Sequence, residues 1–535
     1  MTSAPPPRLT AIVLARDSAP TLPRCLERLR FADEILVVDD GSADRTREIA
    51  VADGARVLSR RLDRFDAQRN WAQQQARSPW VVFIDSDEEV PEALGQEIRA
   101  RVASDGGCAA FAIPRRNYFL GRRMRGAGWA SDHVVRLLRR DAARWEGAVH
   151  EHPRVSGRVG RLATPIEHHP YPTLAAYWDK LEVYARLKSE EDFARGRRAG
   201  GLALLFRPAG VLVRMWILRG GFIDGRHGLV LALMSAFSAF TRQVRLWERG
   251  LAAEPLPAAP GPIAAPSRGG SPLSVLIPAF NEASNLDAAI DSAAWADEIL
   301  VVDSFSTDGT AEIARRRGAR VLVHEYRNSA AQKNWALPQT AHRWAMVLDA
   351  DERFTPELAA EVRDTLAAEP AAAGYVVRRV NHFLSRRIRH CGWDRDRVLR
   401  LFDRDRARYQ ELEVHAEVEV QGEVRELRHP LLHFTYRSVD QYWPKFRRYT
   451  DWGASQAYSD GRRATVYHLV GHPFGRFVKM YGVRLGFLDG VCGLAVSLLS
   501  FYSVFNKYAK LWELGLDGRA GRRDATLVPK AGHSG

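Results

Sequence analysis

Hydrophobic runs of strand length alternate with helical patterns through the first part of the chain. The runs Leu9–Leu14, Ile35–Val38 and Trp80–Ile84 each stop at polar or acidic residues. Helical patterns lie between them, at Thr46–Ala52 and Ala67–Ala76. This alternation predicts an α/β fold with a mostly parallel, doubly wound, Rossmann-like sheet. Open sheets of this kind bind ligands at the carboxyl ends of their strands, which is where the acidic residues stand.

The pattern occurs twice. Residues 31–58 and 295–322 are identical at nineteen of 28 positions, at a constant offset of 264. After one inserted residue the offset becomes 265, and it then relates residues 221–225 to 486–490. A period of this length indicates duplication of a whole domain rather than a solenoid. The strands expected in the second copy are Leu273–Ile277, Ile299–Val302 and Ala345–Leu348.

The repeat sets the expected domain boundaries. We expect a first module over residues 1–252 and a second over 273–516, each ending in amphipathic, interfacial helices. Between them, residues 253–272 are rich in Pro, Ala and Gly, a composition typical of a semi-extended linker. Residues 517–535 form a basic tail.

Composition indicates which partners and which cellular compartment to expect. The formal net charge is +14 and the pI is about 9.8, which favours acidic partners such as anionic lipid or phosphorylated substrates. No nucleic-acid recognition motif accompanies the charge, so we expect no nucleic acid. The four cysteines have no metal-site or disulfide-framework spacing, and the N-terminus lacks the apolar stretch of a signal peptide. A cytoplasmic protein is expected.

Paired aspartates are the strongest chemical signal. Each pair follows a buried strand, and the pattern Asp-x-Asp occurs at the same place in both copies. Two carboxylates so placed can bind one hard cation, Mg²⁺ or Mn²⁺, together with the oxygens of a diphosphate. In a single copy the pair could equally be a solvated turn or a helix cap. The metal candidates are Asp85, Asp87, Asp349 and Asp351.

Other strand-end residues are candidates for binding a nucleotide-sugar. Asp39 and Asp303 end the second strand of each module and could accept a hydrogen bond from a uracil N3–H or a ribose hydroxyl. The alternative is an Asx-turn before a helix capped by Asp44 or Asp308. The strand that leads into the paired aspartates, here called the metal strand, follows a helix with cationic residues. These cations could bind phosphate, although a solvated helical face is the alternative. The further candidates are Asp40, Asn281, Glu282, Gln68, Arg69, Gln332 and Lys333.

Candidate acceptor-binding and catalytic residues follow the metal strand. Trp129 with Arg136, and Trp393 with Arg400, could stack on a sugar ring and hold phosphate, or could be a structural aromatic anchor and a surface ion pair. The neighbouring Asp132 and Asp396 are candidate catalytic carboxylates. His150 and Glu151 offer an acceptor-binding imidazole and a catalytic base. The second copy has His415 but places its glutamate one position later.

These residues together resemble family-2 glycosyltransferases with the GT-A fold. The likeness covers roughly 9–250 and 273–516, and is greatest to the lipopolysaccharide-core glucosyltransferase group, through the stretches WADEILVVDS, DADERFTPEL, RRNYFLGRR and GWDRDRVLRLF. The resemblance implies inverting transfer of a sugar from a nucleotide-sugar, UDP-linked for preference, to a lipid-linked or polysaccharide acceptor. It also implies the nucleotide at Asp39 and Asp303, the metal at the paired aspartates, and a base near Glu151.

The copies depart from the family pattern in different places. The first has Asp17-Ser18 where the second keeps Asn281-Glu282, and the second has Ser304-Phe305 where the first keeps Asp40-Gly41. Phe in place of Gly forfeits easy access to positive φ. One alternative is therefore that only one module is catalytic and the other, more readily the second, is a carbohydrate-binding or assembly scaffold. A sugar nucleotidyltransferase is disfavoured because ALARDSAPTL and PAFNEASNL lack a Gly-rich triphosphate loop.

Apolar helices near each module's end indicate a membrane surface. Leu202–Leu218 contains Arg207, Pro208 and Arg214, and the uncharged runs Gly228–Phe240 and Val491–Phe505 are shorter than the roughly 20 residues of a span. We expect no transmembrane span, and peripheral association with the cytoplasmic face of the inner membrane, with basic residues at lipid phosphates. A buried helical core is the alternative.

Overall fold

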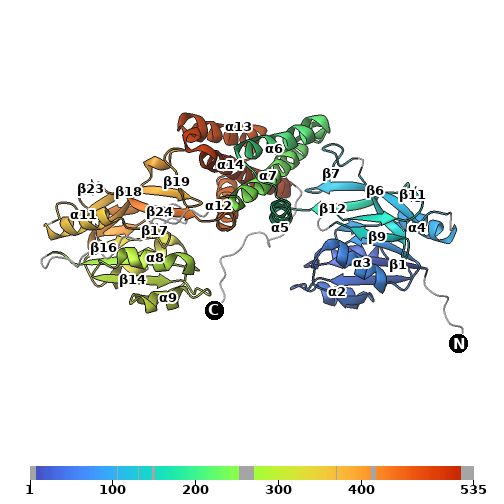
Figure 1. Cartoon of the computed structure of the whole chain (residues 1–535), viewed down its shortest axis with the longest axis horizontal. Helices are drawn as coiled ribbons and strands as arrows, with labels where there is room; N and C mark the ends of the chain where they lie inside the picture. Colours follow the sequence, from blue (N-terminus) through green and yellow to red (C-terminus); the bar gives the residue numbers. More distant parts are fainter. Residues whose placement is uncertain are drawn as a thin grey trace. The chain divides into compact units, whose positions relative to one another are not determined.

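The computed structural model describes residues 8–104, 107–130, 132–147, 151–251, 270–368, 370–410 and 417–519 (Figure 1). These residues form two compact units, of which the first combines the described residues up to 249 with 453–469 and 506–519, and the second combines the described residues between 250 and 452 with 470–505. The first unit thus takes in helical segments that the repeat assigns to the second module. Most of the expected linker and of the basic tail lies outside the described residues.

The first module is built on one mixed sheet with the strand order β3-β2-β1-β4-β8-β6-β12-β5. Strands β1 to β4 run parallel, β8 is antiparallel to both of its neighbours, and β7 and β11 also pair with β6. The ten strands are β1 (Leu9–Ala15), β2 (Glu34–Asp39), β3 (Arg56–Ser59), β4 (Trp80–Asp85), β5 (Glu88–Glu89), β6 (Ala110–Phe119), β7 (Arg122–Arg123), β8 (His133–Arg139), β11 (Val159–Arg161) and β12 (Ile166–Tyr171).

Helices cover both faces of the parallel part of this sheet. Along β1, alternate residues pack into two different hydrophobic clusters, one containing Val13 and the other Ile12, as period-2 geometry requires. The covering helices are α1 (Leu22–Glu27), α2 (Thr46–Ala52), α3 (Phe65–Gln75) and α4 (Glu92–Ser104), and a separate hairpin pairs β9 (Ala143–Glu146) with β10 (His152–Val155).

The second module repeats this sheet, with the order β15-β14-β13-β16-β20-β18-β24-β17. The strands are β13 (Leu273–Ala279), β14 (Glu298–Asp303), β15 (Arg320–Val323), β16 (Trp344–Val347), β17 (Glu352–Arg353), β18 (Gly374–Phe383), β19 (Arg386–Arg387), β20 (Arg397–Asp403), β23 (Val424–Glu426) and β24 (Leu431–Tyr436), with β21 (Ala407–Tyr409) and β22 (Val418–Val420) in a separate hairpin. Its helices are α8 (Ala283–Ala293), α9 (Thr310–Arg316), α10 (Ser329–Ala336) and α11 (Pro356–Ala367). The prediction of two tandem α/β modules is confirmed.

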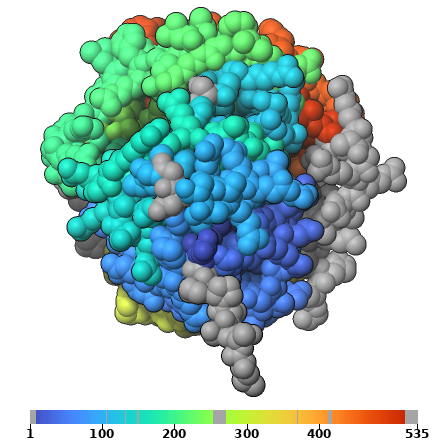
Figure 2. Space-filling model, turned by 90° about the vertical axis from the view of Figure 1, so that its right-hand side faces the viewer, coloured from blue at the N-terminus to red at the C-terminus, as the bar shows by residue number. Residues whose placement is uncertain are grey.

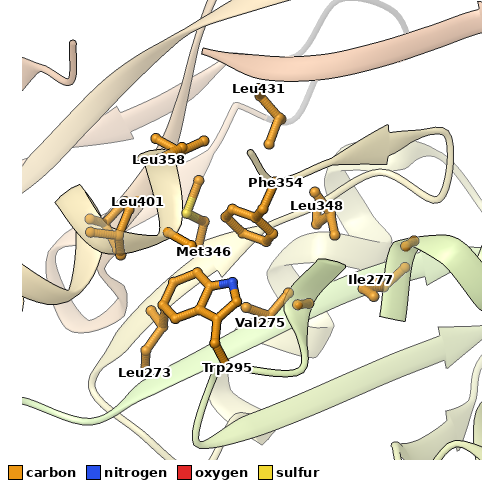
Figure 3. Packing of buried hydrophobic residues seen from close by; sticks show 14 of the residues in the cluster. Leu273, Val275, Ile277, Trp295, Met346, Leu348, Phe354, Leu358, Leu401 and Leu431 are labelled. Carbon is orange, nitrogen blue, oxygen red and sulfur yellow. The ribbon is translucent and has the colours of Figure 1, made fainter. Parts of the chain in front are cut away.

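Large side chains fill the core of the second module (Figure 3). The rings of Trp295 and Phe354 meet edge to face, with centroids 5.1 Å apart. They lie beside Met346 of β16 and Leu348, which follows that strand. Edge-to-face packing of this kind adds to the hydrophobic stabilisation of the core. The packing holds the end of β16, and thus the loop with the paired aspartates, on a rigid support.

Each module continues into helices that expose apolar side chains. In the first module these are α5 (Leu174–Ala194), α6 (Gly201–Val213), the π-helix η1 (Arg214–Leu218), η2 (Gly221–Asp224) and α7 (Gly225–Arg249). In the second they are α12 (Val439–Ser459), α13 (Val466–Phe477), η6 (Val478–Val483), η7 (Gly486–Asp489) and α14 (Gly490–Arg519). By length and composition alone, three described helical stretches could cross a membrane: Gly201–Leu218, Gly221–Arg249 and Gly486–Leu516. The expectation of no transmembrane span is therefore not confirmed.

Candidate active site

The predicted acidic residues meet at the carboxyl ends of neighbouring strands. In the first module Ala15 of β1 pairs with Asp39, and Leu14 pairs with Asp85, so the two aspartates flank the end of β1. In the second, Ala279 of β13 pairs with Asp303 in the same register. Parallel strands place their carboxyl ends at one edge, so each sheet gathers its polar groups where such folds bind ligands.

Two buried arginines hold Asp85. Arg69 of α3 donates to Asp85 Oδ1 from Nη2 at 2.9 Å, and Arg136 of β8 donates to Oδ2. Burial opposes ionisation, but Arg136 and Arg69 hold the pKa of Asp85 well below its usual range. Arg136 also lies near Glu88, which is fully buried. The carboxylate is therefore fixed in its charged form beside two cations.

Arg69 links this pair to Glu151. Its Nε donates to Glu151 Oε1 at 2.8 Å, and the glutamate side chain is only 15% exposed. The guanidinium of Arg69 also lies 4.8 Å from the ring centroid of Trp145. Glu151, the predicted base, thus lies close to Asp85 of β4, although it stands 66 residues further along the chain. His150 lies outside the described residues.

The second module has a matching cluster, with a lysine at the position of Arg69. Lys333 of α10 lies 3.3 Å from Asp349 Oδ1, and Arg400 of β20 donates to Asp349 Oδ2 and to Glu352 Oε1 at 2.6 Å. Burial again opposes ionisation, but Arg400 and Lys333 hold the pKa of Asp349 well below its usual range. The nearest match to Glu151, Glu417, is exposed, and His415 lies outside the described residues.

The second aspartate of the first pair faces an imidazole. Asn117 donates its amide hydrogen to the carbonyl oxygen of Trp129, so its own amide oxygen faces His168 Nδ1 at 2.6 Å. An amide oxygen only accepts, so Nδ1 carries the hydrogen, and Nε2 of the neutral imidazole then presents a lone pair. Burial lowers the pKa of His168 and so favours this neutral form. That Nε2 lies 3.7 Å from Asp87 Oδ1. Two acceptors therefore face each other.

The same arrangement recurs in the second module. Asn381 bonds the carbonyl oxygen of Trp393 and turns its amide oxygen to His433 Nδ1 at 2.5 Å. His433 Nε2 then lies 3.6 Å from Asp351 Oδ1. A lysine reaches the other oxygen of each aspartate, at 2.7 Å from Lys180 of α5 to Asp87 and at 3.8 Å from Lys445 of α12 to Asp351.

Asp39 and Asp303 differ although they occupy matching positions. Asp39 accepts hydrogen bonds from the amides of Gly41 and Ser42 and from the Ser42 hydroxyl at 2.6 Å. Asp303 accepts from the amide of Ser306 through Oδ2, while its Oδ1 is buried without a partner among the described residues. The Asx-turn foreseen as an alternative thus forms at Asp39, through the amide two residues on, whereas Asp303 bonds an amide three residues on. Asp44 and Asp308 accept from the amides of Thr46 and Thr310 at the helix starts.

Several candidate residues of the first module form hydrogen bonds to the backbone or to neighbouring side chains. Asp40 accepts from the amide of Leu62 and from Arg16, and Gln68 donates to the carbonyl oxygen of Arg60. Asp132 is bonded by Arg115, which also reaches Glu88. The Trp129 ring lies 6.2 Å from that of Tyr171. Their proposed roles at donor and acceptor stay predictions.

The matching residues of the second module are placed similarly. Asp396 forms a two-point ion pair with Arg379, and the backbone carbonyl of Trp393 accepts from Asn381. Asn281 accepts from the amide of Thr307, Glu282 accepts from Asn285, and Gln332 donates to the Ser304 hydroxyl. Burial raises the pKa of Glu282, and Asp351 adds to the shift.

Four pairs of ionisable site residues lacked a role in the sequence interpretation, as did the pair Asn117 and Asn381 that orients the imidazoles. They share one property, which is that the repeat offset of 264 or 265 relates each to a partner of the same chemistry. Reading that offset through the whole chain for polar residues would have found them. The ionisable pairs are Glu88 and Glu352, Arg115 and Arg379, His168 and His433, and Lys180 and Lys445.

Comparisons with known proteins agree with this duplicated arrangement. Residues 10–157 and 274–419 each match the model of Glycosyl transferase family 2. The lipopolysaccharide core biosynthesis glycosyltransferase LpsC of Rhizobium meliloti (strain 1021) is 30% identical over 253 residues, 44% of this chain and 93% of that protein. An uncharacterised glycosyltransferase of Rickettsia typhi is 25% identical over 259 residues, 46% of this chain and 89% of its own. Of solved structures, glucosyl-3-phosphoglycerate synthase from Mycobacterium tuberculosis is 25% identical over 21% of this chain and 45% of that one, with a TM-score of 0.19.

A mixed sheet whose parallel strands end at carboxylates and buried cations is an α/β arrangement of the kind that binds ligands at its strand ends. The family matches cover more than half of the chain, and it therefore belongs to glycosyl transferase family 2. Nearly the whole of each relative aligns with less than half of this chain. The chain is thus a glycosyltransferase carrying two copies of the family's domain.

Proposed function

We propose that the protein transfers sugar from a UDP-linked donor to a lipid-linked or polysaccharide acceptor, with inversion at the anomeric carbon, in lipopolysaccharide or other cell-envelope glycan synthesis. The observation that carries the proposal is the repeated cluster of an aspartate pair, buried cations and an oriented imidazole at the strand ends of both modules. The similarity to LpsC, whose name assigns that protein to lipopolysaccharide core biosynthesis, supports an acceptor of the cell envelope.

The residues beside Asp87 and Asp351 fit Mg²⁺ or Mn²⁺. In each module a carboxylate oxygen and an imidazole nitrogen lone pair face one another at 3.6–3.7 Å, and a cation between them would be bound by both. No described group of three or more His, Cys, Asp and Glu residues could hold a metal by itself. Such a pair suits a cation whose remaining ligands are diphosphate oxygens. When bound, the cation neutralises the charge of the departing diphosphate.

The other cations of the cluster have a positioning role. Arg69 and Arg136 occupy both oxygens of Asp85, and Lys333 and Arg400 do the same at Asp349. We therefore propose that the second aspartate of each pair, Asp87 or Asp351, binds the metal. Metal binding by Asp85 and Asp349 stays a prediction. Buried cations at this edge place positive charge where a diphosphate would lie.

Glu151 is the proposed base of the first module. An acceptor hydroxyl attacks the anomeric carbon from the face opposite the diphosphate, the bond from that carbon to the diphosphate oxygen breaks, and the hydroxyl proton passes to the carboxylate of Glu151. Arg69 orients this carboxylate through a hydrogen bond of 2.8 Å. A carboxylate held so close to Asp85 by a shared arginine stands at the reacting edge of the sheet.

One observation favours a second candidate function for the second module. Glu417 is exposed, and among the described residues the only carboxylate within ion-pair distance of Lys333 is Asp349. A module without a positioned base would bind a donor or glycan without transferring it. The alternative is thus a catalytic first module and a second one that serves as a carbohydrate-binding or assembly scaffold.

Two single variants and their double variant test these functions in the full chain. Asp87→Asn and Asp351→Asn each remove one oxygen charge that the cation needs, so each should reduce metal-dependent transfer by its own module about 100-fold or more. The assay follows release of UDP from a UDP-sugar, with bacterial membranes as acceptor and Mn²⁺ present. Full activity in the double variant would refute the mechanism. Exposed Asp141→Asn and Asp364→Asn are the matched controls. Loss with Asp87→Asn alone would support the scaffold alternative.

A membrane-bound acceptor also fits the exposed helices, and we propose that the protein lies on the cytoplasmic face of the inner membrane. In the helices that end the first module, the exposed apolar side chains include those of Leu202, Phe206, Leu218, Phe222 and Ile223. This green segment forms a continuous part of the surface at the upper edge of Figure 2. Exposed arginines accompany it, at positions 207, 214, 219 and 226. Apolar side chains between cations suit a surface of anionic lipid.

Vesicle binding tests this placement. We expect the protein to cosediment with phosphatidylethanolamine–phosphatidylglycerol vesicles, and Phe206→Asp to weaken binding about tenfold or more, because a buried aromatic side chain contributes about 1.5–3 kcal/mol. Val51→Asp, at another exposed apolar position, is the control. Release of the protein by alkaline carbonate would support peripheral attachment, whereas retention would show that one of the three long apolar stretches spans the membrane. Binding that Phe206→Asp leaves unchanged would contradict the role of this segment.

A further inference from the structure

The two modules differ most at one edge of the sheet. Where the flanking sequences are nearly identical, the positions after the first, second and third strands exchange arginines, an aspartate and a glycine for aromatic, neutral and acidic residues. The first module has Arg16, Asp40, Gly41, Arg60 and Arg61 there, and the second has Phe280, Ser304, Phe305, His324 and Glu325. A change confined to the strand ends alters what the edge can bind and leaves the fold intact.

Phe305 is the least expected of these residues. It has a φ of +58°, in the left-handed region, and its side chain is 63% exposed. For a bulky residue this conformation is strained, and exposure of the ring adds no packing that would offset the strain. Phe280, which follows the neighbouring strand, is 56% exposed. Two exposed aromatic side chains therefore follow strands that pair in register, Ala279 with Asp303.

The turn that contains Phe305 leaves a hydrogen-bond acceptor without a donor. In the first module the amide of Gly41 donates to Asp39 Oδ2, and Oδ1 accepts from Ser42. In the second module Asp303 Oδ1 is buried and has no partner among the described residues, although Asp303 is only 3% exposed. A buried carboxylate oxygen without a donor is costly unless a ligand supplies one.

We infer that Phe305 stacks on the base of a nucleoside diphosphate, and that it gives the second module a base-dependent donor affinity that the first module lacks. The inference rests on the proposed function and deepens it. The base supplies an N–H to Asp303 Oδ1 and an aromatic face to the ring two residues later. In the first module, Arg61 lies over Gly41, because a Cβ built on Gly41 would stand 2.6 Å from Arg61 Cζ. That module presents cations to phosphate at the same place.

The variant Phe305→Gly separates a ligand role from a structural one. Glycine adopts positive φ without strain, so the variant should fold as well as the parent or melt at a slightly higher temperature. Loss of base stacking should weaken nucleotide binding about tenfold, within the range seen when stacking aromatics are removed. A residue kept for stability would show the reverse, a lower melting temperature and unchanged affinity.

The experiment is calorimetric titration of the full chain carrying Asp87→Asn, so that metal-dependent binding reports on the second module. UDP and, as the probe without a base, pyrophosphate are titrated with Mn²⁺ present; GDP, ADP and CDP follow if UDP does not bind. We expect Phe305→Gly to weaken nucleotide binding about tenfold and to leave pyrophosphate binding unchanged. Val424→Ala, which trims another exposed apolar side chain of this module, should change neither.

Each other outcome has a distinct meaning. If Asp351→Asn abolishes nucleotide binding while Phe305→Gly leaves it unchanged, the stacking role is wrong and the proposed function stands. If Phe305→Gly weakens pyrophosphate and nucleotide equally, the residue shapes the phosphate site and the base-stacking role is again overturned. If no nucleoside diphosphate binds in the presence of metal, the proposed donor site fails for this module and the inference fails with it.

Discussion

The two modules share their anchors and differ in what they present to a substrate. In both, a buried arginine on the strand antiparallel to the metal strand holds the first aspartate, and an asparagine orients an imidazole toward the second. They differ at the base, where Arg69 holds Glu151 but Lys333 has no such partner among the described residues, and at the nucleotide edge, where Gly41 is replaced by Phe305. Duplication has thus kept the parts that position charge and varied the residues proposed to touch ligand.

The largest expected difference between the modules concerns the base. In a chain carrying Asp351→Asn, which should leave only the first module active, Glu151→Gln should lower the rate of transfer about 10²–10⁴-fold, the usual contribution of a general base. In a chain carrying Asp87→Asn, Glu417→Gln should have little effect, because that side chain is exposed. Initial rates of UDP release measure both. A first module that keeps its rate without Glu151 would place the base elsewhere and remove this difference between the modules.

Part of this arrangement was readable from the sequence. The apolar runs ending at Asp39 and Asp85 predicted strands whose ends meet, and the constant offset predicted that a second sheet would repeat them. Periodicity reports local structure well because each residue's face follows from its position along the strand.

The rest depended on contacts that no local pattern encodes. Glu151 meets Arg69 across 82 residues, and His168 reaches Asp87 from a strand that pairs with β5. Residues 453–469 and 506–519 lie in the first unit, which the repeat could not show because it relates positions along the sequence and not contacts in space. Conversely, the strand-end aspartates were expected to bind ligands directly, whereas both oxygens of Asp85 are taken by arginines.

The second expected effect concerns the buried arginine that both modules share. Arg136→Ala and Arg400→Ala each remove one of the two cations that hold the first aspartate and leave only Arg69 or Lys333, which should cost up to about 3–5 kcal/mol of unfolding free energy. Arg400→Ala should cost more, because Arg400 bonds the fully buried Glu352 at 2.6 Å while Arg136 lies 3.9 Å from Glu88.

Thermal unfolding of the full chain measures this difference, with Arg343→Ala as the control. Arg343 pairs with Asp403 from an exposed position, and its loss should cost much less than the loss of either buried arginine. Equal losses for the two buried arginines would mean that the contact with the second glutamate adds nothing.

The smallest expected effect concerns the glycine that the second module has replaced. Gly41 has a φ of +67°, so Gly41→Ala should destabilise the fold by about 1–2 kcal/mol through backbone strain alone. Its Cβ would also stand 2.6 Å from the Arg61 guanidinium. Gly54 is the matched control, because its φ is +83° and a Cβ there would meet nothing within 4 Å. Chemical denaturation of both variants therefore separates the two costs: loss in Gly41→Ala beyond that in Gly54→Ala measures how firmly Arg61 is held over the turn. Equal losses would show that Arg61 moves aside freely, and the contrast between a cationic edge in one module and an aromatic edge in the other would then rest on Phe305 alone.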